Sequence, residues 1–250
     1  AMDREELPFN RAERSWAYRA AKNVDSTIAF GSTRSLTPAG SVLFVNCPFP
    51  TLTEDAAEPG EVTLGPYCRH PYKTRSLFNI SGMSYGAISK PAIQALSRGA
   101  KKAGCWMNTG EGGVSTYHLE SGCDLVYQIG TAKYGVRDSG GHLSDEKLKA
   151  ISDHEQIRMF EIKLSQGAKP GKGGILPGAK VTAEIAAIRG IEIGEDSISP
   201  NGHPDINSVE DLLDMVAHIR DVTGKPVGFK VVIGSSAWID NMCSIILARG

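Results

Sequence analysis

The sequence predicts an α/β protein of the TIM-type (β/α)8 barrel class, of which about the first five strand–helix units are present. From residue 77 onward, short apolar segments alternate with capped helical segments, and this alternation is typical of a parallel sheet. The loops rich in glycine and polar residues all follow predicted strands, at the end where α/β barrels carry their chemistry. A doubly wound sheet would place a G-x-G-x-x-G turn directly after its first strand, and the sequence has none.

Residues 1–75 are predicted to form an N-terminal helical and loop extension, and residues 76–250 the first part of the barrel. The extension begins with a helix at about residues 11–22 and continues with proline-rich loops. Apolar runs in the second segment predict strands at 77–81, 105–109, 125–129, 197–199 and 227–233, the last of them strongly buried. A barrel needs more strands than these, so we expect the others in a longer protein or on another chain.

Helices are predicted where apolar residues recur at helical spacing between capping residues. They are expected at 89–103, 144–164, 208–222 and 237–248. The first is stopped by Gly104, and the third begins at the capping residue Ser208 and ends before Gly224. The apolar spacing in 144–164 is interrupted near Asp153.

Composition is that of an ordinary globular protein: 41% of the 250 residues are hydrophobic, 22% are charged, and the formal net charge is −1. No global field attracts nucleic acid, so none is expected as a partner. No apolar run reaches the roughly 18–20 residues that span a bilayer, so no membrane segment is predicted in this chain. The opening residues AMDREE resemble what remains of a cleaved tag, which leaves open an N-terminal membrane anchor removed upstream.

The five cysteines are odd in number and widely spaced, and none forms a C-x-x-C pair or a clustered iron–sulfur spacing. Such cysteines are typical of small buried hydrophobic residues in a reducing compartment, which predicts a cytoplasmic protein. No metal site is predicted within residues 1–250.

The most informative segment is the loop 167–180, which holds five glycines, two prolines, three lysines and no acid. Glycine and proline bring almost no apolar side chain, so core packing cannot stabilise this loop. Its backbone N–H groups and its positive charge suit an anion of carboxylate or phosphate type. The alternative is a solvated loop whose lysines only confer solubility.

Three further groups would meet this loop at the mouth of a barrel. The turn 82–86 (GMSYG) lets the backbone approach a flat aromatic ligand. Glu111 lies among glycines in 108–113 (NTGEGG), so its carboxylate is expected in a cleft, the alternative being a surface glutamate. Lys230 lies in an apolar strand, where the cost of desolvation favours contact with an anion or an electron-rich ligand over snorkelling to solvent.

Several segments match the pattern of a known family. They are 81–89 (SGMSYGAIS), 108–113 (NTGEGG), 163–182 (KLSQGAKPGKGGILPGAKVT), 184–189 (EIAAIR), 199–212 (SPNGHPDINSVEDL) and 229–232 (FKVV). Together they closely resemble the FMN-binding central domain of glutamate synthase. Residues 42–52 (VLFVNCPFPTL) look more like the stand-alone glutamate-synthase-related proteins, which lack the amidotransferase domain, and the resemblance covers about residues 40–250.

The resemblance implies a (β/α)8 barrel that holds FMN and makes L-glutamate from 2-oxoglutarate and ammonia through 2-iminoglutarate. It implies a keto-acid site formed by Lys163, Gln166, Lys169, Arg189 and Ser208. Glu111 would lie beside the reacting carbon and pass a proton, with Lys169 as the second catalytic residue. The residues implied to bind the flavin ring are Gly82, Met83, Ser84, Asn108, Thr109, Gln128 and, at its N1–C2=O edge, Lys230.

The implied partners are a 2-oxo dicarboxylate, ammonia, and an electron donor or a glutaminase partner protein. The family's 3Fe-4S cysteines and the loops that bind the FMN phosphate would fall after residue 250. This chain has SPNGHPD at 199–205 where the family usually has SPPPHHD, which leaves open a loop shaped for another substrate. Two alternatives therefore stay open: a related flavoenzyme that makes an N-substituted glutamate from another amine, and a non-catalytic FMN- or anion-binding module of a larger complex.

Overall fold

The computed structural model describes residues 9–24, 39–43, 45, 47–57 and 60–249. Contacts within the chain divide it into two compact units, Ala1–Ala56 and Ala57–Gly250. The second unit includes an antiparallel pair of short strands, β1 (Val62–Leu64) and β2 (Tyr72–Thr74). The domain boundary between residues 75 and 76 stays a prediction.

The first unit contains helix α1 (Arg11–Ala21) and a short 3-10 helix, η2 (Thr53–Asp55). Helix α1 begins with a reciprocal capping box. The Asn10 side chain accepts the backbone N–H of Glu13 at 3.0 Å, and the Glu13 carboxylate accepts the backbone N–H of Asn10 at 2.7 Å. The helix predicted at 11–22 is confirmed.

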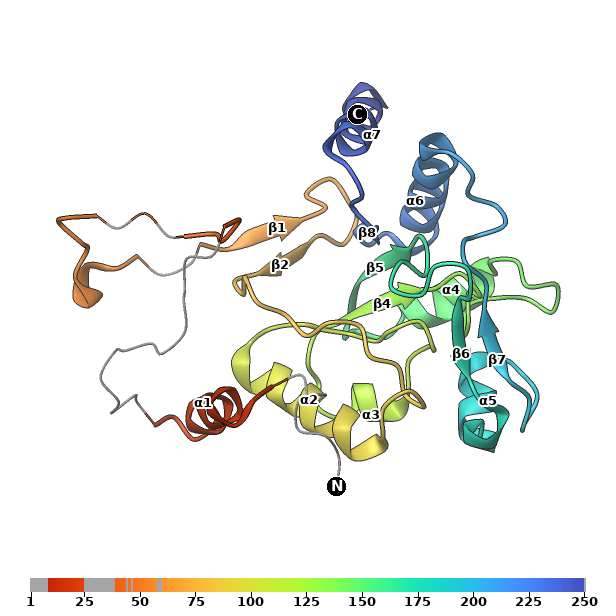
Figure 1. The fold of residues 1–250 in the computed structure, drawn as a ribbon. Helices are drawn as coiled ribbons and strands as arrows, with labels where there is room; N and C mark the ends of the chain where they lie inside the picture. The colour runs from red at the N-terminus through yellow and green to blue at the C-terminus, as the bar shows by residue number, and fades with distance from the viewer. Residues whose placement is uncertain (1–8, 25–38, 44, 46, 58–59, 250) are drawn as a thin grey trace. The chain divides into compact units, whose positions relative to one another are not determined.

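The centre of the second unit is a four-stranded sheet in the order β3-β4-β5-β8 (Figure 1). Its strands are β3 (Met107–Asn108), β4 (Leu125–Ile129), β5 (Ile157–Lys163) and β8 (Val227–Lys230). A single parallel bridge joins Ile80 to Met107 of β3. Every pairing in this sheet is parallel, so the carboxyl ends of the strands lie along one edge.

Helices accompany these strands and cover an apolar core. They are α2 (Lys90–Ala103), α3 (Thr116–Leu119), α4 (Asp145–Ser152), α6 (Val209–Thr223) and α7 (Ser236–Arg249). Tyr127 of β4 and Phe160 of β5 are fully buried, and their ring centroids lie 5.7 Å apart. Ile93, Leu148 and Ile219 belong to the same cluster, which ties α2, α4 and α6 to the sheet.

A second, smaller sheet lies outside the parallel one. Strands β6 (Gly174–Leu176) and β7 (Ser197–Ser199) pair antiparallel, and the chain between them forms a 3-10 helix, η3 (Gly178–Lys180), and helix α5 (Ala183–Arg189). Leu176 and Ile185 belong to a small apolar cluster of their own. We call the pair β6–β7 the hairpin (Figure 1).

The predicted helices at 89–103, 208–222 and 237–248 and the strand at 125–129 are confirmed. Gly104 and Gly224 end α2 and α6 in the left-handed conformation, at φ of 68° and 71°. The Ser208 hydroxyl accepts the backbone N–H of Asp211 at 3.0 Å and so caps α6 as predicted.

The helix predicted at 144–164 is wrong beyond Ser152, where α4 ends and β5 follows. The reason is an irregularity in the β4–β5 pairing. Leu125 and Val126 are consecutive, but their partners are Ile157 and Met159, so β5 carries one extra residue. This bulge separates the buried Ile157 and Phe160 by three positions, and that spacing imitates a helix.

The segment predicted as a strand at 197–199 is extended, but it pairs antiparallel with β6 and does not belong to the parallel sheet. The segment is short and has a serine at each end, so its sequence did not indicate which strand it pairs with. At 77–81 the strand is reduced to the bridge at Ile80, and at 105–109 it is reduced to β3.

The strand predicted at 227–233 ends at Lys230, and it is not strongly buried. The cause is its place at the edge of the sheet, with β5 on one side only. Val232 and Ile233, which follow it, are 55% and 68% exposed.

The mixed α/β chain with its parallel sheet is compatible with part of an α/β barrel, and closure into eight strands stays a prediction. Among the residues that the structure describes, no helix has both the length and the apolar character needed to cross a bilayer.

Candidate active site

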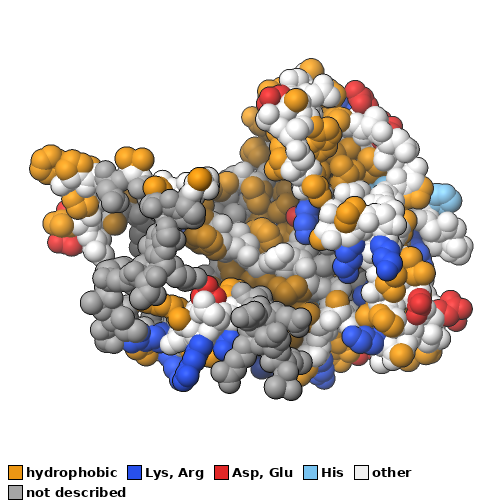
Figure 2. All heavy atoms as spheres, in the orientation of Figure 1, with side chains coloured by type: hydrophobic (Ala, Val, Ile, Leu, Met, Phe, Trp, Pro, Cys, Tyr) orange, Lys and Arg blue, Asp and Glu red, His pale blue; other side chains and the backbone are white. Residues whose placement is uncertain are grey.

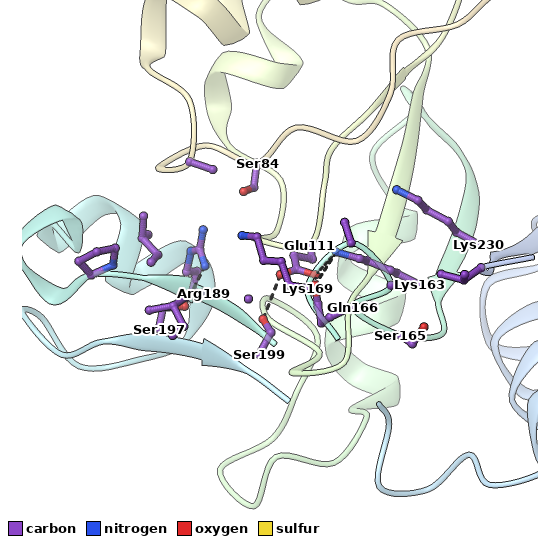
Figure 3. Close-up of a pocket in the computed structure, with 18 of the residues that line it drawn as sticks. Ser84, Glu111, Lys163, Ser165, Gln166, Lys169, Arg189, Ser197, Ser199 and Lys230 are labelled. Carbon is purple, nitrogen blue, oxygen red and sulfur yellow. Dashed lines mark hydrogen bonds and ion pairs between the residues drawn. The ribbon is translucent and has the colours of Figure 1, made fainter. Parts of the chain in front are cut away.

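A cavity of about 410 Å³ lies where the ends of β5 and β8 meet the hairpin (Figure 3). Strand β5 leads into it through Lys163, and β8 through Lys230. Its polar and charged lining residues are Ser84, Glu111, Lys163, Ser165, Gln166, Lys169, Lys180, Arg189, Ser197, Ser199 and Lys230. The cavity therefore brings together residues from segments that are far apart in the sequence.

Glu111 is held by side chains from two segments. Its Oε2 atom accepts hydrogen bonds from Lys163 Nζ at 2.8 Å and from Gln166 Nε2 at 2.7 Å. Lys163 Nζ also donates to Gln166 Oε1 at 2.9 Å, which closes a triangle of hydrogen bonds. The second carboxylate oxygen, Oε1, accepts from Ser199 Oγ of the hairpin at 3.1 Å.

The turn that carries Glu111 is fixed by the residues just before it. Asn108 Oδ1 accepts the backbone N–H of Gly110 at 2.9 Å. The buried Thr109 hydroxyl accepts the backbone N–H of Gln128 at 3.1 Å and so joins the turn to β4. The chain therefore leaves β3 in a defined direction, and Glu111 reaches the end of β5.

The Glu111 carboxyl group is ionised at neutral pH. Burial raises its pKa, but hydrogen bonds from Lys163 and Gln166, the charge of Lys163 and the Ser199 hydroxyl outweigh that effect, so the pKa lies below its ordinary value. A lowered carboxyl pKa stabilises the folded chain above the ordinary value, and this stabilisation is lost as the pH falls through the lowered one. At neutral pH Glu111 is therefore a carboxylate, the form that can accept a proton.

Arg189 is a buried cation at the end of α5, only 4% exposed. Its Nη1 donates to Ser197 Oγ at 2.8 Å, and its Nη2 donates to the Tyr85 carbonyl at 3.4 Å. Its Nε has no partner among the described residues, and its guanidinium lies 5.3 Å from the Tyr134 ring centroid. Burial lowers the pKa of Arg189, yet a guanidinium stays charged in proteins. Arg189 can thus bind an anion.

The basic loop does contribute to the cavity. Gly167 lies against the chain that follows β8: a Cβ at this position would come within 1.7 Å of Val232 Cγ2. Lys169 and Lys180 line the same cavity as Lys230. In Figure 2, several Lys and Arg side chains gather beside a hollow in the second unit. Five cationic side chains, Lys163, Lys169, Lys180, Arg189 and Lys230, line the cavity with a single acid, Glu111.

A second cleft, of about 350 Å³, shares Lys230 with the first. It contains four of the residues implied to bind a flavin, namely Lys230 itself, Gly82, Asn108 and Gln128. Its acid, Glu161, accepts from Asn108 Nδ2 at 2.9 Å and from Gln128 Nε2 at 2.6 Å. The carboxylate therefore fixes which end of each amide faces it.

One observation indicates that the second cleft fits the flat ring of a flavin. A Cβ on Gly82 would lie 2.8 Å from Asn108 Oδ1 and 3.2 Å from Gln128 Nε2, so only glycine leaves the backbone this close to the two amides. Oriented amides and an ammonium group are the donors and acceptors that the polar edge of an isoalloxazine ring requires.

The remaining residues of the predicted site lie outside the second cleft. Ser84 lines the first cavity. Thr109 is fully buried in the turn described above. The Met83 carbonyl lies 3.4 Å from Nε2 of the buried His118, and the exposed Ser208 caps α6, so neither residue is among those that line the two cavities. The binding roles of Met83, Thr109 and Ser208 stay predictions.

The sequence interpretation named neither Glu161 nor Ser199 as a contributor to these sites, and it assigned no role to His203, the one histidine in a candidate site loop. Glu161 lies two residues before Lys163 and therefore on the same side of β5, which is the one signal that could have found it. Ser199 and His203 are contained in the segment 199–205, but their partners, Glu111 and Lys163, are distant in the sequence. Within the described residues, no group of three or more His, Cys, Asp or Glu side chains could hold a metal ion.

Comparison with known proteins identifies the family. A model described as the conserved region in glutamate synthase matches residues 51–246. The glutamate synthase large subunit-like protein YerD of Bacillus subtilis is 46% identical over 168 residues, which are 67% of this chain and 32% of that protein.

Two further relatives are named glutamate synthase [NADPH]. The archaeal-type enzyme of Thermotoga maritima is 42% identical over 153 residues, 60% of this chain and 28% of that protein. The archaeal enzyme of Methanocaldococcus jannaschii is 41% identical over 154 residues, 61% of this chain and 28% of that protein. The chain thus spans less than a third of the length of these curated relatives. Because the family model matches most of its residues, the chain belongs to the glutamate synthase family.

Proposed function

We propose that the protein is an FMN-dependent oxidoreductase of glutamate synthase type, which reduces 2-iminoglutarate, formed from 2-oxoglutarate and ammonia, to L-glutamate. Family membership supports the reaction class. The observation that carries the proposal is the ionised Glu111, held by Lys163, Gln166 and Ser199 in a cavity that is otherwise cationic.

The charge of the cavity supports a dicarboxylate substrate. A 2-oxo dicarboxylate brings two negative charges to five cationic side chains and one carboxylate. We assign its carboxylates to Arg189 and to Lys169 of the basic loop, which both line the cavity. Charge-assisted hydrogen bonds of this kind are about twice as strong as neutral ones.

We assign the second cleft to the ring of FMN, with Gly82, Asn108, Gln128 and Lys230 as the residues that hold it. When bound and reduced by the electron donor, FMN would supply the hydride that reduces the imine. Lys230 lines both the cleft and the substrate cavity, and its ammonium group is therefore expected between cofactor and keto acid.

Glu111 would transfer the protons that imine formation requires. Its Oε2 already accepts two hydrogen bonds, whereas Oε1 accepts only the longer one from Ser199. Oε1 is thus the atom expected to take a proton as ammonia adds to the keto carbon and to return it as water leaves. We further propose that electrons and ammonia come from a partner, an electron donor or a glutaminase.

The proposal is tested by adding FMN to the purified full-length protein. We expect tight binding with visible flavin absorbance, and we expect chemically reduced, FMN-loaded protein to turn 2-oxoglutarate and ammonia into glutamate. Chemical reduction makes the test independent of the natural electron donor. A protein that neither contains flavin nor takes it up would contradict the proposal.

Replacing Lys169 with alanine is expected to lower kcat/KM for 2-oxoglutarate by about 10- to 100-fold, because a charge-assisted contact contributes about 1.5–3 kcal/mol. Lys172→Ala is the matched control: Lys172 belongs to the same loop but does not line the substrate cavity. Equal effects of the two substitutions would point to a general charge effect. A non-catalytic module would show no turnover to lose and would keep its partner in both variants.

One observation favours the alternative of another amine. Asn201 and Gly202 stand where the family usually has prolines, and this part of the loop touches the substrate cavity through the hydrogen bond from Gln166 N–H to the Asn201 carbonyl at 3.0 Å. An enzyme that makes an N-substituted glutamate would use methylamine better than ammonia at equal concentrations of free base. Preference for ammonia would exclude it.

A further inference from the structure

The loop 200–205 follows β7 in the connection to α6, and it is hydrogen-bonded to the segment just after β5. Gln166 N–H donates to the Asn201 carbonyl at 3.0 Å, and an isolated antiparallel bridge pairs Ser165 with Gly202. On its other side, Thr131 Oγ1 donates to the Pro200 carbonyl at 2.6 Å. The loop in which this chain departs from the family pattern is therefore in direct contact with the segment that carries Lys163 and Gln166.

His203 is the buried side chain of this loop, only 5% exposed. Its Nε2 lies 3.0 Å from the backbone carbonyl of Lys163. A carbonyl can only accept, so Nε2 must carry the hydrogen, and in the neutral ring Nδ1 then carries none. Burial lowers the pKa of His203 and favours this neutral ring.

The Nδ1 atom of His203 is buried and has no partner among the described residues. A buried acceptor without a hydrogen-bond partner costs free energy, so a general need for a polar side chain does not explain an imidazole here. What its position provides is one directed hydrogen bond, to the residue that pairs with Glu111.

The charged groups that face His203 are Lys133, Asp205, Glu111 and the adjoining Lys163. Lys133 is 3% exposed, has a positive φ of 52°, and pairs with Asp205 at 2.8 Å. This buried pair anchors the end of the loop just beyond His203. The charge of Lys133 further lowers the pKa of His203, and those of Asp205 and Glu111 raise it.

We propose that His203 is a positioning residue: its Nε2–H holds the backbone of Lys163 and thereby directs the Lys163 ammonium to Glu111. Its role in binding and reducing the keto acid rests on the function proposed above, but its action on Glu111 does not. Loss of the hydrogen bond lets Lys163 move away from Oε2, and the Glu111 carboxylate loses its strongest hydrogen-bond partner.

Two near-isosteric substitutions separate this role from simple packing. In His203→Gln the amide nitrogen extends as far as Nε2 and can still donate to the Lys163 carbonyl, whereas in His203→Asn it extends only as far as Nδ1. The pKa of Glu111, measured by carbon NMR in the ligand-free protein, is expected to rise by about one unit in His203→Asn. In His203→Gln it is expected to stay near the wild-type value. Equal pKa values in wild type and His203→Asn would overturn the proposal.

The same variants are then assayed with the FMN-loaded protein. We expect His203→Asn to raise KM for 2-oxoglutarate about tenfold, equivalent to about 1.4 kcal/mol, and to move the acidic limb of the kcat/KM profile to higher pH. His203→Gln should restore both. If wild-type protein makes no glutamate, the proposed function fails, but the Glu111 titration still decides the role of His203.

The wild-type protein provides a check that needs no variant to fold. Nitrogen NMR of the imidazole should show His203 neutral at pH 7 with its proton on Nε2. A proton on Nδ1 would leave nothing to hold the Lys163 carbonyl and would contradict the proposal.

Discussion

Replacing Glu111 with glutamine is expected to lower kcat by about 100- to 10,000-fold, which is the usual contribution of a positioned acid or base. The amide keeps the size of the side chain but cannot take up the proton released when ammonia adds to the keto carbon. It also turns an N–H₂ or a weaker acceptor toward Lys163 and Gln166, which both donate to Oε2 in the wild type. The measurement is steady-state glutamate formation at saturating 2-oxoglutarate and ammonia.

The control is Glu192→Gln, a substitution of an exposed glutamate that lines neither cavity. It should leave kcat unchanged. FMN affinity should be unaltered in both variants, because Glu111 is not part of the second cleft. If Glu111→Gln retained kcat within about threefold of the wild type, a proton-transfer role would be excluded.

Replacing Gly173 with alanine is expected to displace the hairpin. The residue has a positive φ of 70°, which costs about 1–2 kcal/mol for a residue with a Cβ. The new Cβ would lie 2.1 Å from the Ser199 carbonyl oxygen, and the resulting overpacking costs about 1–3 kcal/mol more. Because Ser199 donates to Glu111, we expect lower turnover together with a lower free energy of unfolding.

Gly171→Ala separates the two costs. Gly171 also has a positive φ, of 81°, but a Cβ there would meet nothing within 4 Å. Denaturant titration of both variants should therefore give the larger loss of stability for Gly173→Ala, and that variant alone should lose activity. Indistinguishable variants would show that the hairpin yields to the new Cβ without cost.

Sequence patterns located the elements whose signal is local. Gly104 and Gly224 end helices because they supply the left-handed conformation, and β4 is apolar except for Gln128. Strand pairing depends on residues that are distant in the sequence, and the wrongly predicted elements are those that strand pairing determines. The bulge in β5 gave a helical spacing, and β6 is a glycine-rich segment that becomes a strand only because 197–199 lies beside it.

The residues of the candidate site divide in the same way, into those that the sequence predicts and those that depend on distant contacts. Glu111 follows one predicted strand and Lys230 lies in another, so the predicted fold alone brings these two residues to one end of the sheet. Lys163 lay at the end of the helix predicted at 144–164, so Lys163 and Gln166 were expected at the site from the family resemblance. Arg189 and Lys169 come with the family resemblance and line the same cavity. The roles of Ser199, Glu161 and His203 were not predicted, because each acts on a side chain or carbonyl more than 30 residues away in the sequence.

The cationic lining of the substrate cavity has a consequence for every measurement of ligand affinity on this protein. A cavity with five cationic side chains and one acid attracts whatever small anion the solution offers. Sulfate, phosphate or citrate in the buffer would occupy the position of a substrate carboxylate and compete by mass action. Apparent dissociation constants should therefore depend on the identity of the buffer salt as well as its ionic strength, and chloride or a bulky organic anion is the appropriate medium.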